Sequence, residues 1–218
     1  MITNFFNRKV VKIYRSIARA KINKHNIAQL KNQNFSIISS NCNGAFLLHD
    51  LKQKFRSPTV NLWFEPSDFI EFLSHLEKYL SIEIEFSDEL GRKKGYPVGI
   101  LHRKVKVYFQ HYKSCEEARQ KWKERCTRVC MDNLFIMFTD RDGCSYEDIA
   151  HFDALPYQNK VIFTNKPYPE FKSAFYIPGF ENESSVGHCF DYTSTWTGEK
   201  VYDIFPYIKW LNGELIHF

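Results

Sequence analysis

The apolar positions of this chain fall into short runs that alternate with segments of helical periodicity. Short apolar runs bounded by Gly, Pro, Ser, Asn or Asp predict buried strands. These runs are 35–39, 59–63, 98–101, 105–110, 133–138 and 160–164, with 174–177 as a weaker seventh. Apolar residues three or four positions apart predict helices instead. These segments are 45–54, 67–80, 114–125, 145–153 and 201–211.

Alternating strands and helices are typical of an α/β domain on a mainly parallel sheet. We therefore expect an α/β, Rossmann-like three-layer sandwich, mainly parallel, with a central sheet of about six or seven strands. The runs 98–101 and 105–110 are too close for a crossover helix, so they predict a hairpin or one interrupted strand. We place this single α/β domain at residues 32–218.

Residues 1–31 differ from the rest of the chain in charge. They hold eight Lys or Arg and no Asp or Glu, whereas the other 22 basic residues are outnumbered by 25 acidic ones. Apolar side chains recur there at helical spacing: Phe6, Val10, Ile13, Ile17 and Ala20. This arm is predicted to be a basic amphipathic helix. Two interpretations stay open: the helix packs on the domain, or it lies on an anionic membrane surface.

The bulk composition narrows the class of protein. The chain is 44% hydrophobic and 25% charged, which fits a globular protein. No apolar run approaches the roughly 18 residues that span a bilayer, and the N-terminus lacks a signal-peptide core. We expect a cytoplasmic protein, with peripheral attachment to the inner face of the plasma membrane as the option that residues 1–31 leave open. No segment resembles a nucleic-acid module, so we expect no nucleic-acid partner.

The most informative segment is 35–50, which predicts a strand, a tight turn and a helix. The turn consists of Ser40, Asn41, Cys42, Asn43 and Gly44. A helix start presents unpaired N–H groups and the positive end of the dipole, which favour an anion or a thiolate. We predict that this turn binds an anionic donor or an oxyanion, with a lowered pKa making Cys42 a candidate nucleophile. The alternative is a packing role for Cys42, with Gly44 permitting close helix approach.

Two further strand ends carry candidate chemistry, and ligands bind at the carboxyl edge of open parallel sheets. His111 follows one run and is a candidate general base, while Lys113 is a candidate phosphate ligand. Asp140, Arg141 and Asp142 follow the run 133–138. Their carboxylates are candidates for orienting a base or a sugar, and Arg141 for holding a phosphate. Each of these three candidates has a structural alternative. His111 could be an ordinary hydrogen-bonded histidine, Lys113 a surface lysine, and 140–142 an Asx-type turn that caps a helix.

Two other features complete the inventory of candidate groups. The chain has six cysteines but no C-x-x-C pair, so we expect separate reduced thiols and no metal site. The long polar segment 182–200 contains His188, Asp191 and Trp196. It could close over the cleft at the carboxyl edge, or it could be variable surface.

Several segments taken together resemble a bacterial family of unknown function, number 1919. They are FSIISSNCNGAFL, SPTVNLWFEPSDFIEFL, YPVGIL, HYKSCEEARQKWKERC, DNLFIMFTDRDGC and FDALPYQNKVIFT. Members are often encoded near capsule and exopolysaccharide genes, and some are labelled acetyltransferases. The resemblance therefore implies surface-polysaccharide work. A looser likeness is to capsule-biosynthesis proteins that bind coenzyme A at a strand, Asn-Cys, helix turn. Asn41 and Cys42 match that dipeptide, whereas Asn43 stands where glutamine is expected.

These observations favour a transferase of exopolysaccharide or capsule biosynthesis that modifies a sugar, with acyl transfer preferred. The expected partners are a glycan or sugar-nucleotide substrate and, as donor, coenzyme A or acyl-coenzyme A. The first alternative is a glycosyltransferase or glycan-phosphate transferase that uses the turn at 140–142. The second is a non-catalytic partner of the polysaccharide assembly machinery, docked at the inner membrane through residues 1–31.

Overall fold

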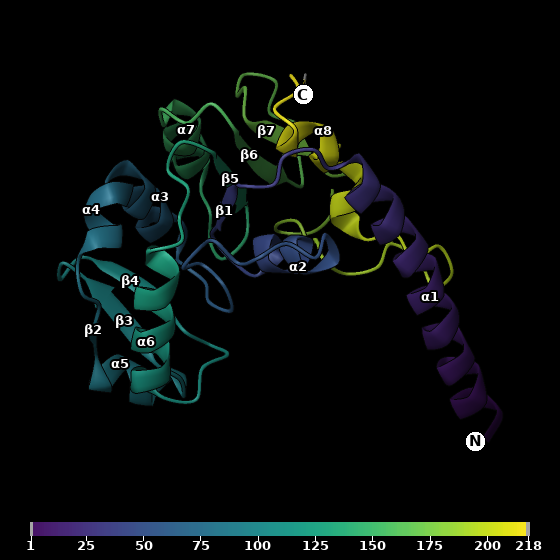
Figure 1. Ribbon diagram of the computed structural model, residues 1–218, viewed down its shortest axis with the longest axis horizontal. Helices are drawn as coiled ribbons and strands as arrows, with labels where there is room; N and C mark the ends of the chain where they lie inside the picture. The colour runs from purple at the N-terminus through teal and green to yellow at the C-terminus, as the bar shows by residue number, and fades with distance from the viewer. Residues whose placement is uncertain (1, 217–218) are drawn as a thin grey trace.

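The protein contains two sheets, one long N-terminal helix and several shorter helices. The computed structural model describes residues 2–216, with side chains from Val10 onward (Figure 1). Four parallel strands form the main sheet in the order β1 (Ser36–Ser39), β5 (Leu134–Thr139), β6 (Lys160–Thr164), β7 (Ala174–Tyr176). A second, antiparallel sheet has the order β2 (Glu85–Phe86), β3 (Val98–Leu101), β4 (Val105–Tyr108). The fold is therefore mixed α/β, as the alternating pattern predicts.

The expected single sheet of six or seven strands is wrong, because the parallel sheet has four strands. The runs at 98–101 and 105–110 form a hairpin whose turn places His102 and Arg103 at positive φ. Since a hairpin cannot supply a crossover, these strands pair antiparallel with β2 in a sheet of their own. The run 59–63 forms no strand; its last residue, Trp63, makes an isolated antiparallel bridge with Tyr108.

Apolar side chains alternate between the two faces of the parallel sheet, as a period of two requires. On one face Ile38, Ile136 and Phe138 join a buried cluster with residues of α3, α6 and α7 and of the antiparallel sheet. On the other face Ile37 and Phe135 join a second cluster with α2, η1 and α8. The bounds are α2 (Asn43–Asp50), α3 (Pro66–Ser74), α4 (Leu76–Ser81), α5 (Asp88–Lys94), α6 (Cys115–Cys126), α7 (Tyr146–Ala154), η1 (Val201–Ile204) and α8 (Tyr207–Leu211). The sheet is thus covered on both sides, which the predicted three layers require.

Two predicted helices are interrupted in the structure. The segment 67–80 is divided into α3 and α4 at His75, whose backbone has φ −134° and ψ 37°. The segment 201–211 is divided into η1 and α8 at Phe205 and Pro206, because both residues have non-helical ψ values. Proline also disfavours helical geometry in the residue before it. The apolar period continues across both breaks, so periodicity alone does not reveal them.

The predicted N-terminal helix is confirmed as α1 (Ile2–Gln29). Figure 1 shows its C-terminal half beside the body of the protein and its N-terminal half extending away from it. Arg19 in the middle of the helix is buried, as is Leu30 just beyond its end. The predicted contribution of Phe6 lies outside the residues whose side chains are described. Among residues 2–216, no helix combines the length and the apolar character that crossing a bilayer requires.

Candidate functional site

The candidate site lies at the carboxyl edge of the parallel sheet, where the ends of β1, β5 and β6 meet. Ser40 follows β1; its amide donates to Met137 O at 3.2 Å, and its carbonyl accepts from the Phe64 amide at 2.9 Å. Asn41 Nδ2 donates to Thr139 Oγ1, at the end of β5, at 2.9 Å. The turn 40–44 is therefore held against β5, and the predicted strand, turn and helix are confirmed.

The start of α2 is packed closely on β1. A Cβ atom on Gly44 would lie 2.8 Å from Ser39 Cβ and 2.9 Å from Ile37 Cγ2. Glycine is therefore required there for close approach, as one of the two readings of this turn predicts. The Asn43 amide donates to Asn41 Oδ1 at 3.1 Å, and the Gly44 amide to Ser39 Oγ at 3.4 Å. Because these two backbone amides at the start of α2 already donate hydrogen bonds within the protein, binding of an anion there would depend mainly on side chains.

Asn43 is the buried polar group of this turn that stays unsatisfied. Its side chain is fully buried, and neither its Oδ1 nor its Nδ2 has a hydrogen-bond partner in the part of the chain that the structure describes. The neighbouring Cys189 thiol interacts with this amide, but burial raises the pKa of Cys189 to about 12, so the thiol stays neutral. A neutral thiol is a weak partner, and an unsatisfied buried amide costs free energy. Because the Asn43 side chain is fully buried, its interaction with the Cys189 thiol contributes to the packing of the turn.

Cys42 is half-buried immediately before α2. Burial raises the pKa of its thiol, and the positive charge of Arg141 acts in the opposite sense without reversing the shift. The predicted lowering of this pKa is therefore wrong, because desolvation outweighs the helix start. Cys42 and Arg141 are nevertheless close enough to interact electrostatically, so the structure brings together two residues that the sequence singled out.

Asp140 anchors a loop onto the end of β5. Its Oδ2 accepts from the Asn165 amide and its Oδ1 from the Val186 amide, each at 2.7 Å. Burial raises the pKa of Asp140, and the two amides oppose that rise. Asp142 is exposed, with φ 61°, in the turn that precedes α7. Asp140 thus positions the segment around Val186, and Asp142 is a turn residue; neither contact tests a catalytic role.

The loop that follows β7 brings His188 to Arg141. Arg141 Nη1 lies 2.5 Å from His188 Nδ1. A guanidinium can only donate, so His188 Nδ1 accepts and the ring hydrogen lies on Nε2. The next aromatic residue, Phe190, stacks on His188 at 4.9 Å and on Phe46 of α2 at 4.1 Å between ring centroids. The polar segment 182–200 therefore lies against this edge. The sequence analysis named His188 and Arg141 separately but did not predict that they contact each other.

His111 and Lys113 do not join this group. Both are exposed beyond the end of β4, and the Lys113 amide donates to Glu117 Oε2 at 3.1 Å. Between them, Tyr112 turns inward: its hydroxyl donates to Val60 O at 2.8 Å and contacts Arg125. Burial raises the pKa of Tyr112, and the neighbouring Arg125 opposes that rise. His111 follows β4, and β4 belongs to the antiparallel sheet. The expectation of a single parallel sheet placed His111 at the wrong edge for this reason.

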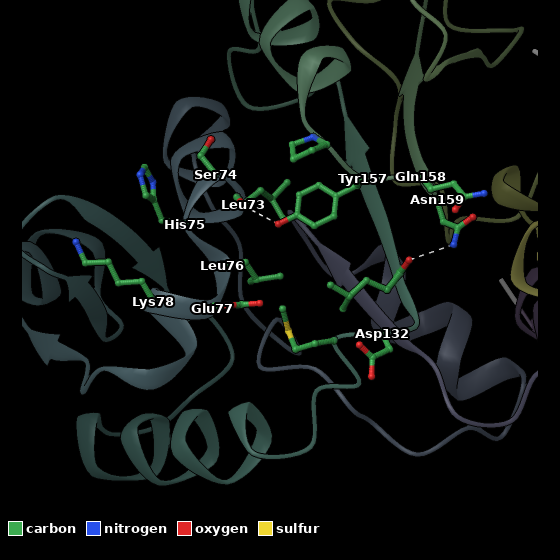
Figure 2. A pocket seen from close by; sticks show the side chains of 13 residues that line it. Leu73, Ser74, His75, Leu76, Glu77, Lys78, Asp132, Tyr157, Gln158 and Asn159 are labelled. Atoms are coloured by element: carbon green, nitrogen blue, oxygen red, sulfur yellow. Dashed lines mark hydrogen bonds between the residues drawn. The ribbon is translucent and has the colours of Figure 1, made fainter.

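A cavity lies at the opposite edge of the sheet (Figure 2). Its volume is about 610 Å³. Its lining includes His75, Glu77, Lys78, Asp132, Tyr157 and Asn159. Tyr157 crosses it to donate to Leu73 O at 2.6 Å. None of the predicted site residues lines this cavity. It faces the amino ends of β5 and β6, whereas open parallel sheets bind ligands at the carboxyl ends. The convergence of Cys42, Arg141 and His188 therefore remains the better candidate.

Comparison with known proteins agrees with the resemblance seen in the sequence. Residues 13–212 match the family described as Domain of unknown function (DUF1919). An uncharacterized protein of Haemophilus influenzae is 50% identical over 191 residues, which cover 88% of this chain and 90% of that protein. The family match includes both sheets and every residue of the candidate site. The chain therefore belongs to the DUF1919 family.

Proposed function

We propose that this protein is a transferase of bacterial surface-polysaccharide biosynthesis that holds a phosphate-bearing donor at the carboxyl edge of β1 and β5. The observation that carries the proposal is the contact of Arg141 with His188, whose ring stacks on Phe190 and is thereby linked to Phe46 of α2. Arg141 supplies a planar set of donors that suits phosphate oxygens, and His188 Nε2–H adds a donor that is not used by Arg141. Two donors from distant segments thus converge near the start of α2.

The site chemistry favours a donor that carries a diphosphate. Coenzyme A and nucleotide sugars share that group, and both suit the sugar-modifying reaction expected from the sequence. In acyl transfer, a sugar hydroxyl attacks the thioester carbonyl of acyl-coenzyme A. The new C–O bond forms, the C–S bond breaks, and the hydroxyl proton passes to the departing thiolate. Because burial raises the pKa of Cys42, direct transfer from the bound donor is preferred to a thioester on Cys42.

The alternative of a glycosyltransferase or glycan-phosphate transferase that uses the turn at 140–142, with a divalent cation on its carboxylates, receives less support. Both carboxylate oxygens of Asp140 already accept backbone hydrogen bonds. Binding a cation there would compete with the attachment of the loop at Val186. The role of His111 as general base stays a prediction. Comparing the activity of His188→Ala with that of His111→Ala would show which of the two histidines the reaction requires.

A thermal-shift titration with coenzyme A, acetyl-coenzyme A and nucleotide sugars tests the donor site. A ligand that binds only the folded state raises the melting temperature by mass action. The matched pair is Arg141→Ala and Arg92→Ala, since Arg92 is exposed on α5, within the part of the fold that contains the antiparallel sheet. We expect one ligand to stabilise the native protein and Arg92→Ala but not Arg141→Ala. Equal stabilisation of both variants, or no stabilisation by any phosphate-bearing ligand, would overturn the proposal.

A further inference from the structure

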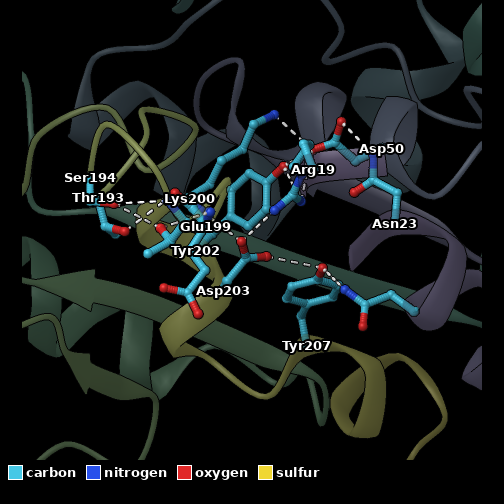
Figure 3. Close-up of polar contacts among 12 residues, drawn as sticks. Arg19, Asn23, Asp50, Thr193, Ser194, Glu199, Lys200, Tyr202, Asp203 and Tyr207 are labelled. Atoms are coloured by element: carbon cyan, nitrogen blue, oxygen red, sulfur yellow. Dashed lines mark hydrogen bonds and ion pairs between the residues drawn. The ribbon is translucent and has the colours of Figure 1, made fainter. Parts of the chain in front are cut away.

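We propose that the outward face of α1, together with Trp196, docks this protein on an anionic membrane surface. The argument starts from how the helix is fixed to the body. Figure 3 shows Arg19 inserted among polar groups of η1 and of α2. Arg19 Nη2 lies 2.9 Å from Asp50 Oδ2 and 3.2 Å from the Tyr202 hydroxyl, and Nη1 pairs with Asp203. These buried contacts determine which side of α1 faces the body.

The opposite side of α1 carries an exposed apolar stripe. Its members and exposed fractions are Val10 46%, Ile13 62%, Tyr14 53% and Ile17 53%. At 100° per residue, spacings of three and four place these side chains on one face. Arg19 follows Val10 by nine positions, which places it about half a turn away. Since Arg19 faces the body, the stripe faces away from it, along the part of α1 that extends from the body in Figure 1.

A second segment adds an aromatic side chain to this surface. Trp196 is 56% exposed, and its ring contacts Tyr14 edge-on at 5.8 Å. Gly198, at φ 72°, brings the loop onto the helix, because a Cβ atom there would lie 2.8 Å from Ala18 Cβ and 2.7 Å from Arg19 N. Tryptophan and tyrosine are the residues that prefer the interface between a bilayer and water. A loop near the C-terminal end and the N-terminal helix therefore form one surface.

Charge identifies the occupant of this surface. Residues 1–31 hold eight basic residues and no acidic one; Arg19 is buried in ion pairs, whereas Lys21 and Lys24 continue the outward face of α1 as exposed side chains. A second copy of this helix would bring like charges together, which opposes self-association. An anionic lipid surface would instead accept the stripe in its apolar region and the basic side chains among its headgroups. The buried contacts of Arg19 support the interpretation in which the helix packs on the domain, and the exposed stripe supplies the surface that the membrane interpretation requires.

Co-sedimentation of the full-length protein with vesicles tests the docking. We expect binding to phosphatidylglycerol–phosphatidylcholine vesicles, little binding to pure phosphatidylcholine, and weaker binding at high salt because screening reduces the attraction. The double variant Ile13→Ser/Ile17→Ser should lose at least tenfold in affinity. Ile204→Ser, which alters an exposed apolar residue outside the stripe, should bind like the native protein. Unchanged melting temperatures show that the variants are folded.

Two outcomes would overturn the proposal. One is equal vesicle binding by Ile13→Ser/Ile17→Ser and Ile204→Ser, or none by the native protein. The other is a concentration-dependent dimer in analytical ultracentrifugation that Ile13→Ser/Ile17→Ser abolishes, because the stripe would then contact a second copy. Neither result bears on the donor site, whose thermal-shift test uses different residues and no lipid.

Discussion

Arg19 and Asp50 are 31 positions apart in sequence, yet their guanidinium and carboxylate lie 2.9 Å apart in a buried contact between α1 and the end of α2. Lys200 Nζ donates to the same Asp50 oxygen at 2.7 Å, and Tyr202 also donates to it. Asp203 supplies the second negative charge by pairing with Arg19. Two positive and two negative groups are thus enclosed together. The short helix α2 has the candidate site at its start and this network at its end.

Replacing Asp50 should destabilise the protein strongly. Asp50→Ala leaves Arg19 and Lys200 buried without their shared partner, and removal of one member of a buried ion pair costs roughly 3–5 kcal/mol. Urea denaturation at pH 7 measures the change in the free energy of unfolding. Asp132→Ala removes an exposed carboxylate and should change it by less than about 0.5 kcal/mol. A loss below about 1 kcal/mol for Asp50→Ala would contradict the enclosed network.

The network also predicts acid sensitivity. Burial alone would raise the pKa of Asp50, but hydrogen bonds from Lys200 and Tyr202 and the charge of Arg19 outweigh burial and lower it. A carboxylate with a lowered pKa stabilises the fold above its unfolded pKa, and that contribution is lost as the pH falls through the folded value. We expect this stabilisation to be complete above about pH 5 and to decline at more acidic pH. The difference in stability between native protein and Asp50→Asn, measured from pH 7 to pH 3, should shrink accordingly.

Asp68 should behave in the opposite way. Burial raises its pKa to about 6, with Glu65 and Glu71 adding to the rise and Lys106 opposing it. Because the folded state then holds the proton more tightly than the unfolded state, this site costs stability as the pH rises from about 4 to 6. Asp68→Asn should therefore stabilise the protein at pH 7 by roughly 1–3 kcal/mol and have little effect near pH 4. Thermal denaturation of the native protein and Asp68→Asn at pH 7 and pH 4 distinguishes this pH-dependent stabilisation from one that is equal at both pH values.

A methyl group at Gly44 should disturb the packing of α2 on β1. The close approaches to Ser39 and Ile37 leave no space for it, and such overpacking costs about 1–3 kcal/mol. Gly91→Ala is the matched control, because its Cβ atom would meet only Tyr96 O at 3.7 Å, inside helix α5. That control should stabilise by up to about 1 kcal/mol, since alanine favours helices more than glycine. Equal effects of the two substitutions would argue against the packing role.

Loss of one Asp140 oxygen should release the loop near His188. In Asp140→Asn, a side-chain NH₂ group would face one of the two backbone amides that now donate to the carboxylate, which leaves a buried donor unpaired at about 1–3 kcal/mol. Hydrogen exchange should accelerate at Val186 and Asn165. Asp142→Asn changes an exposed turn residue and should leave exchange at both amides as in the native protein.

Local sequence signals predicted those parts of the structure that depend on neighbouring residues. The period of apolar residues and the turn Ser40–Gly44 predicted β1, the turn and α2. The short separation of 98–101 from 105–110 predicted a hairpin or one interrupted strand, and the structure has the hairpin. The predicted helices 114–125 and 145–153 begin at Ser114 and Ser145. The structure confirms both starts, since each serine side chain accepts a hydrogen bond from the amide three residues later. These interactions span a few residues, so composition and spacing suffice to reveal them.

The sequence by itself therefore determined most of the elements, the basic arm and the location of the candidate turn, but not β2, α5 or the absence of a strand at 59–63. Only the tertiary structure decided that β3 and β4 leave the parallel sheet, that Tyr112 is buried whereas His111 is exposed, and that His188 contacts Arg141. It also decided that Arg19 faces inward, which leaves the apolar stripe of α1 exposed. The reason is physical: strand pairing and burial depend on packing between distant segments, and no local pattern records which distant segment completes a contact.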